Sequence, residues 1–240
     1  MNVHTAWPWL GLALVPILLV LLFYTDLLRG DPKIPRWKDY LWLAWLLLPV
    51  YMIHQFEEHG IDLRGHYYAF REALCGALGF PYPSTCPLSE AFFTAVNLGT
   101  VWGSALISGL WGRGRPLLAL AAWGIPAING VTHIAQAIYR LQYNPGLLTS
   151  IILFLPLSVW VIRRAMAEPS IGRSGAMLIL KVGVSVHVVL IGSILVFVSG
   201  KLSEGTLIAV NLLNTGVPAL IAAGFRRPWS STARPSRRDR

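Results

Sequence analysis

Residues 40–59 read YLWLAWLLLPVYMIHQFEEH. From Tyr40 to Ile53 the segment has no charged residue, and its 20 residues match the length that an α-helix needs to cross the hydrocarbon core of a bilayer. The last six residues differ, because they contain four ionisable side chains: His54, Glu57, Glu58 and His59. The segment therefore predicts a membrane-spanning helix that ends in a cluster of ionisable residues.

The rest of the chain has the same apolar character. It has 240 residues, of which 55% are hydrophobic and 13% charged, whereas a soluble domain has about 25% charged residues. The mean hydropathy is +0.56. Six further apolar runs are long enough for a spanning helix: roughly 6–24, 89–110, 116–138, 146–163, 176–199 and 206–224. We therefore predict an all-α, polytopic transmembrane bundle of about seven helices over residues 1–225, and a basic, disordered tail at 226–240.

Positive charge is concentrated on one side of this predicted bundle, because the basic residues gather in every second connection between the runs. The net charge is +9, and fifteen Lys and Arg residues fall in 25–39, 111–115, 163–175 and 225–240, against four in the connections of the other side. Because short cytoplasmic segments carry the excess of Lys and Arg, the N-terminus is expected outside and the C-terminus in the cytoplasm. A nucleic-acid-binding protein would gather this charge on one soluble face. The expected partner is therefore a lipid bilayer, with no nucleic acid, and the expected location is a bacterial inner membrane.

The ionisable residues of 40–59 share one helix face. At about 100° per residue, His54, Glu57 and Glu58 point to the same side, and His59 is expected to face elsewhere or to lie past the end of the helix. Carboxylates inside a membrane are costly unless they are paired, bound to a metal or open to water. The face therefore predicts a chemical site; the alternative is an interfacial turn whose carboxylates meet water.

Two other runs carry matching polar faces. In the run 116–138, Asn129, His133 and Gln136 follow one another at helical spacing and Arg140 continues the stripe just beyond it, and in 89–110 Asn97 is the candidate site member. From the rise per residue, all three polar faces reach the same depth, in the outer half of the bilayer. We therefore predict a single site in which His54, Glu57 or Glu58, and His133 meet. The alternative is a set of hydrogen bonds that joins packed helices.

Three further features leave alternatives open. The turn 143–146 (Tyr-Asn-Pro-Gly) opens the next helix, or else Tyr143 and Asn144 cover the site. His187 stands alone in the run 176–199, where a packing role is favoured over a functional one. Cys75 and Cys86 lie in one non-cytoplasmic segment, where a disulfide and two separate thiols are both compatible with the spacing.

The motifs also resemble those of a known family. Three of them occur in the order found in the HXXEE-domain family of integral membrane proteins: His54-x-x-Glu57-Glu58, Asn129-x-x-x-His133 and Tyr143-x-Pro145-Gly146. The resemblance covers about residues 40–165. Ile128-Asn129-Gly130 departs from the Asn-Ala start of the second motif but leaves His133 in place. The resemblance implies a membrane location and a shared site, and it implies no particular reaction.

The residue types of this site favour a metal-dependent, hydrolase-like enzyme. Two histidines and a carboxylate suit Zn²⁺ in an open catalytic site, so His54, Glu58 and His133 are the candidate ligands. Glu57 is the candidate general base or acid, with Glu58 as its neighbouring carboxylate, and Asn97 or Asn129 would orient a ligand or polarise a carbonyl. The substrate would be a lipid or another apolar molecule.

Two other functions remain open at this stage. The paired glutamates could carry out metal-free acid–base chemistry, as in an isomerase. The same carboxylates could relay protons in a non-enzymatic transporter or proton-coupled carrier. The sequence leaves the oligomeric state undetermined.

Overall fold

The structure is a computed structural model that describes residues 2–225. The predicted basic tail at 226–240 lies outside the described residues. The described part is all-α, as predicted, and its one β-type contact is an isolated antiparallel bridge between Ile61 and Tyr67.

The helices follow the seven predicted runs. The first two are α1 (Val3–Tyr24) and α2 (Tyr40–His59). The third run contains α4 (Glu90–Thr94), a π-helical stretch (Ala95–Trp102) and α5 (Gly103–Trp111). The fourth contains α6 (Pro116–Ala121) and α7 (Gly124–Arg140). The fifth contains α8 (Leu147–Thr149), a second π-helical stretch (Ser150–Phe154) and α9 (Leu155–Ala167). The last two are α10 (Gly172–Val198) and the pair α11 (Glu204–Asn214) and α12 (Val217–Gly224).

Several of these helices are long and apolar enough to cross a membrane. Five qualify, and α11 with α12 makes a sixth if this pair, bent by 40°, forms one span. The 20-residue helix α2 is not among them, because the polar residues of its last turns offset its apolar ones.

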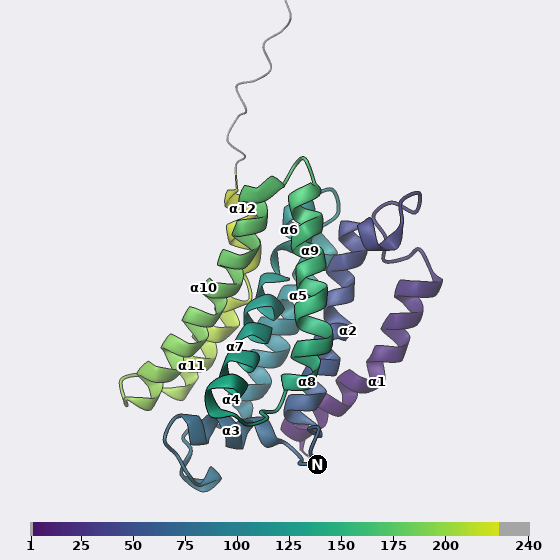
Figure 1. Cartoon of the computed structure of the whole chain (residues 1–240). Coiled ribbons are helices and arrows are strands. Elements are labelled where there is room, and N and C mark those ends of the chain that lie inside the picture. Colours follow the sequence, from purple (N-terminus) through teal and green to yellow (C-terminus); the bar gives the residue numbers. More distant parts are fainter. Residues whose placement is uncertain (1, 226–240) are drawn as a thin grey trace, which may run out of the picture.

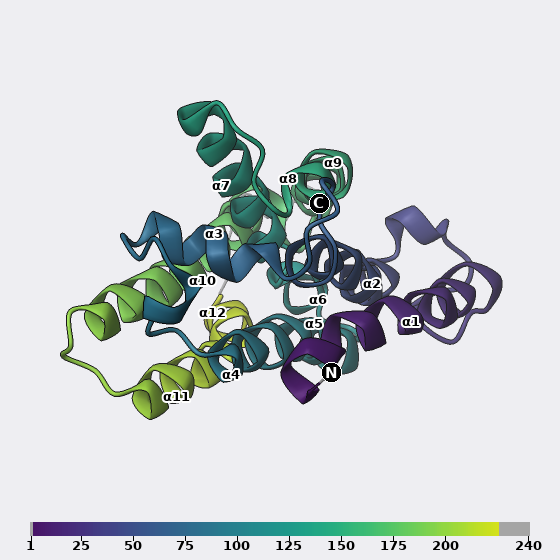
Figure 2. The same cartoon turned by 90° about the horizontal axis from the view of Figure 1, so that it is seen from below.

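Helix α2 lies inside the bundle and organises its core. It packs against α1, α5 and α6, and Figures 1 and 2 show it enclosed by the other helices. Two buried tryptophans tie it to its neighbours. The indole of Trp42 donates to the Leu22 carbonyl at 2.8 Å, and that of Trp123 donates to the Leu43 carbonyl at 2.9 Å. Both donors are thus satisfied inside an apolar core.

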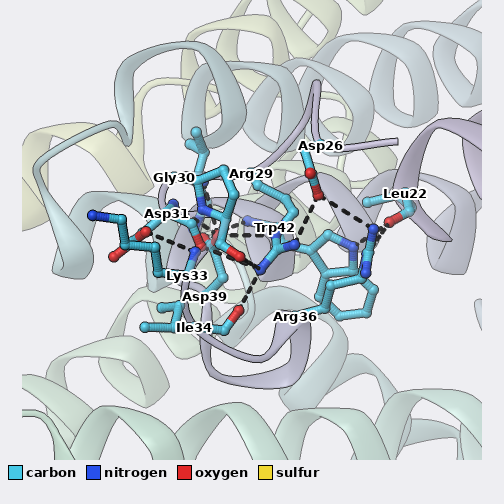
Figure 3. A network of polar contacts seen from close by, with 12 residues as sticks. Leu22, Asp26, Arg29, Gly30, Asp31, Lys33, Ile34, Arg36, Asp39 and Trp42 are labelled. Carbon is cyan, nitrogen blue, oxygen red and sulfur yellow. Dashed lines mark hydrogen bonds and ion pairs between the residues drawn. The ribbon is translucent and has the colours of Figure 1, made fainter. Parts of the chain in front are cut away.

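The connection between α1 and α2 is held by buried charge (Figure 3). Arg29 is only 7% exposed and donates to Asp26 and to three backbone carbonyls of the same loop, those of Asp31, Pro32 and Ile34. Asp39 accepts hydrogen bonds from the backbone N–H groups of Gly30, Asp31, Leu41 and Trp42, the last two of which begin α2. This network therefore closes the loop and caps α2.

The other end of the bundle carries a cap, which we define as residues 60–88. It contains a short helix, α3 (Ala69–Ala77), and a single turn at Pro83–Thr85. A disulfide joins Cys75 to Cys86, with their Cα atoms 5.7 Å apart. We call the end of the bundle with this segment the cap end, and the end at Phe225 the tail end (Figure 1).

Candidate functional site

The last turns of α2 place two polar side chains beside a third on α7. His54, Glu58 and His133 are all buried, with exposed fractions of 0%, 5% and 4%. Glu58 Oε1 lies 3.1 Å from His133 Nε2, and Glu58 Oε2 lies 3.4 Å from His54 Nε2. One ligand atom from each residue falls within 4.8 Å of the other two. The predicted meeting of α2 and α7 at one point is confirmed, and we refer to these residues as the triad.

The orientation of the His133 ring is determined by Asn144. The Asn144 Nδ2 donates to the His133 backbone carbonyl at 2.9 Å, which leaves its Oδ1 facing the ring Nδ1 at 2.6 Å. An amide oxygen is only an acceptor, so Nδ1 carries the proton. In the neutral ring, His133 Nε2 therefore presents a lone pair to Glu58.

The orientation of the His54 ring is determined by Thr149 in the same way. The Thr149 hydroxyl donates to Glu57 Oε2 at 2.6 Å, so its lone pair is free to accept from His54 Nδ1 at 2.7 Å. This assigns the Nδ1 proton to the second histidine as well. In the neutral rings, two imidazole nitrogens and a carboxylate thus converge, an arrangement that a cation between them would stabilise.

Glu57 lies next to the triad but has a different environment. Its two oxygens accept four hydrogen bonds, from the Tyr143 hydroxyl (2.8 Å), the Leu148 N–H (3.0 Å), the Thr149 N–H (2.8 Å) and the Thr149 hydroxyl. The carboxylate therefore fixes the start of the fifth run, where a helix N-terminus favours negative charge. Burial, together with the hydrogen bond to Glu57, raises the pKa of Tyr143, which keeps its hydroxyl a donor.

The turn at 143–146 covers the site as well as opening α8. Gly146 has a φ of +92°, and a Cβ there would lie 2.8 Å from the Cε1 atoms of both His54 and His133. Only a glycine fits this backbone conformation at this distance. The sequence left a simple turn and a cover over the site as alternatives; the structure shows that Tyr143, Asn144 and Gly146 all contact the site.

The two candidate asparagines take different places. The Asn129 amide donates to His54 Nε2 at 3.3 Å, so Asn129 adjoins the triad. Asn97 lies farther out: its Oδ1 accepts from Gln55 at 2.8 Å, and its Nδ2 is 3.2 Å from His59 Nε2. Asn97 is thus connected to the triad through His59, whose Nε2 is 3.7 Å from Glu58 Oε2.

The prediction for His59 was wrong. It was expected to face away from the site, but it is buried and lies beside Glu58. The reason is that α2 is enclosed on nearly all sides, so more than one of its faces points into protein. The sequence analysis also missed Gln55 and Thr149. Only Gln55 could have been suspected, because it is a polar residue between two site residues of an apolar helix.

A cavity of about 280 Å³ adjoins the triad. Glu58, His59, Asn97, Asn129 and His133 supply polar groups to its wall, which is otherwise mainly aromatic and aliphatic. Gln136 also lines it, whereas Arg140 is exposed at the end of α7. His187 lines the cavity too, and its Nδ1 is satisfied by the Gly183 carbonyl of its own helix at 2.8 Å.

This architecture defines a class of protein: a helical integral membrane protein with a buried His–Glu site between two of its helices. Residues 45–161 match the model of the HXXEE family, described as "Protein of unknown function with HXXEE motif". The chain is therefore an HXXEE-domain protein, and the matched region contains the triad and the turn that covers it. No curated protein and no solved structure matches the chain.

Proposed function

We propose that this protein is a metal-dependent membrane enzyme, hydrolase-like, that binds a Zn²⁺-type ion through His54, Glu58 and His133 and acts on a lipid or another apolar substrate. The observation that carries the proposal is the convergence of two Nε2 lone pairs on the Glu58 carboxylate, with both Nδ1 atoms engaged by other partners. A divalent cation between these groups would stabilise their close approach.

The donor set fits such an ion. Zinc bonds of ~2.1 Å at tetrahedral angles place neighbouring donor atoms ~3.4 Å apart. Glu58 Oε1 lies 3.1 Å from His133 Nε2 and Glu58 Oε2 lies 3.4 Å from His54 Nε2, and one ligand atom from each residue lies within 4.8 Å of the other two. Asn144 and Thr149 hold the opposite nitrogens, as the outer partners of metal-binding histidines commonly do. Three protein ligands beside a cavity correspond to a catalytic site rather than a closed structural one.

The other residues then take supporting roles. A bound ion of this kind would supply a water whose pKa is lowered toward ~7. Asn129 can orient a ligand at the triad, and His59, held by Asn97, can hydrogen-bond a water on the cavity side. Glu57 acts as a positioning residue rather than the acid or base, because its oxygens already accept four hydrogen bonds.

The membrane arrangement follows the same reasoning. We place α2 and the α11–α12 pair across the bilayer with the other five helices, which makes seven spans. The cap end faces outward, because its disulfide belongs in an oxidising compartment and the basic loops lie at the opposite end. The location we propose is a bacterial inner membrane.

Metal analysis tests the proposal. The full chain, purified in detergent after zinc loading and buffer exchange, should hold one ion per chain by elemental mass spectrometry. His133→Ala should lose it. The matched control is His187→Ala, a histidine of the same cavity that is outside the triad. Equal metal content in these two variants would refute the assignment.

One observation also favours a second function, metal-free acid–base catalysis. The separations of 3.1 and 3.4 Å equally suit hydrogen bonds from a protonated imidazole to Glu58. Absence of metal from the wild-type protein, with full activity in a strong chelator, would support this alternative.

A further inference from the structure

The cavity beside the triad reaches the lateral surface of the bundle. Among the described residues that line it, Thr132 and Ile191 are the ones that are also exposed. Thr132 belongs to α7 and Ile191, 49% exposed, belongs to α10. A residue that lines a cavity and is exposed marks its mouth, so the cavity opens between these two helices.

The mouth results from the way α7 and α10 cross. Toward the tail end their backbones touch at Gly124 and Gly183, where a Cβ on either glycine would lie 1.9 Å from a carbonyl oxygen of the other helix. Toward the cap end, α7 swings away from the bundle, as Figure 2 shows. Because α7 and α10 touch at the two glycines and diverge beyond them, the gap between the two helices widens toward the cap end.

The depth of the mouth determines what can enter. Thr132 lies eight residues before the end of α7 at Arg140, and Ile191 lies seven residues before the end of α10 at Val198. At 1.5 Å per residue, the mouth is ~10–12 Å below the cap end of both helices. In a hydrocarbon core of ~30 Å, this depth meets acyl chains rather than water.

The interior fits one apolar chain. Its wall contains Phe70, Phe92, Phe93, Leu190 and Ile194, and two residues of the triad, Glu58 and His133, are among its polar lining residues. A volume of about 280 Å³ is at the small end for ligand sites, too small for a whole two-chain lipid. The shape therefore suits a narrow amphiphile with its polar group at Glu58 and His133.

We infer that a single-chain lipid enters this cavity from the bilayer, through the gap between α7 and α10, and presents its polar group to the triad. The inference rests on the proposed function for what happens to the lipid's polar group at the triad, but entry of the lipid itself needs no bound ion. Lipid access and metal binding can therefore be tested separately.

The experiment uses the full chain in lipid nanodiscs and a monoacylglycerol with a diazirine in its acyl chain. After illumination, peptide mass spectrometry should find label on the inner wall, at Phe92, Phe93 and Leu190. Ile191→Trp should reduce this label to the level of an unilluminated sample, because the indole fills the mouth. Val188→Trp is the matched control: it lies on the same helix, is 64% exposed and does not line the cavity, so label should persist.

Two results would overturn the inference: wall labelling that survives Ile191→Trp, or wall labelling lost equally in Val188→Trp. Ile191→Ala, which widens the mouth, should retain the label and so separates blockage from misfolding. His133→Ala should also retain it. Wall labelling in a protein that binds no metal would support lipid entry and refute the metal proposal. Metal binding without wall labelling would support the metal proposal and refute lipid entry.

Discussion

Asn144 contacts His133 at two points, with its Oδ1 2.6 Å from the ring Nδ1 and its Nδ2 2.9 Å from the backbone carbonyl. Loss of such an outer partner typically weakens metal binding about 10–100-fold. We therefore expect Asn144→Ala to lower zinc affinity by this factor in a competition titration with a chelating dye. Asn144→Asp keeps an acceptor for Nδ1 and should lose less. Gln136→Ala, in the same cavity, is the control, and an equal loss in that variant would contradict the prediction.

Glu57 and Glu58 should differ when each is changed to glutamine. Glu57→Gln places an amide against four donors, so we expect the free energy of unfolding to fall by ~2–4 kcal/mol. Glu58→Gln removes a charge that faces two lone pairs, and should change stability little in chelator while abolishing metal binding. Thermal unfolding in detergent with chelator measures both. Equal destabilisation would show that the two carboxylates have the same structural role.

Gly146 should be intolerant of a methyl group for two reasons. Its φ is +92°, and the new Cβ would press on both triad histidines. Backbone strain alone costs ~1–2 kcal/mol, so Gly146→Ala should lower the free energy of unfolding by more than that and also reduce metal content. Gly114→Ala provides the comparison, because Gly114 has a φ of +69° and an added Cβ would meet no atom within 4 Å. It should show the strain without the loss of metal.

The crossing of α7 and α10 depends on its two glycines. Gly124→Ala would bring a Cβ to 1.9 Å from the Ile179 carbonyl oxygen, so the helices must separate. Overpacking of this kind costs ~1–3 kcal/mol, and thermal unfolding should detect it. Gly192→Ala is the control on α10, because nothing lies within 4 Å of its added Cβ. Similar unfolding temperatures for the two variants would argue against a tight crossing.

The orientation of the bundle is testable with reporter fusions. A reporter that is active only outside the cytoplasm should be silent when fused after Arg240, because the basic segments lie on the side of the C-terminus. The same reporter fused after Lys201, between α10 and α11, should be active. The opposite pattern would reverse the proposed topology and place the disulfide in the cytoplasm.

Helix positions and part of the site were predictable from the sequence. The apolar run 40–59 coincides with α2, and the run 89–110 differs by one residue at each end from Glu90–Trp111. The meeting of His54 and Glu58 with His133 followed from helical periodicity and equal depth. Periodicity and depth can each be read from one helix at a time. The chain must form helices in a bilayer because the hydrocarbon core holds no water to hydrogen-bond the backbone N–H and C=O groups.

The all-α class, the helix positions and the triad could therefore be derived from the order of residues alone. The packing of the helices settled which group surrounds which: that Thr149 and Asn144 orient the two histidines, that Glu57 is engaged by four donors, and that His59 faces Glu58. These contacts depend on how each helix is rotated and crossed against its neighbours. Rotation and crossing follow from close contacts between helices, such as the contact of the glycines of α7 and α10. Such contacts involve two helices, so the residue pattern of one helix does not reveal them.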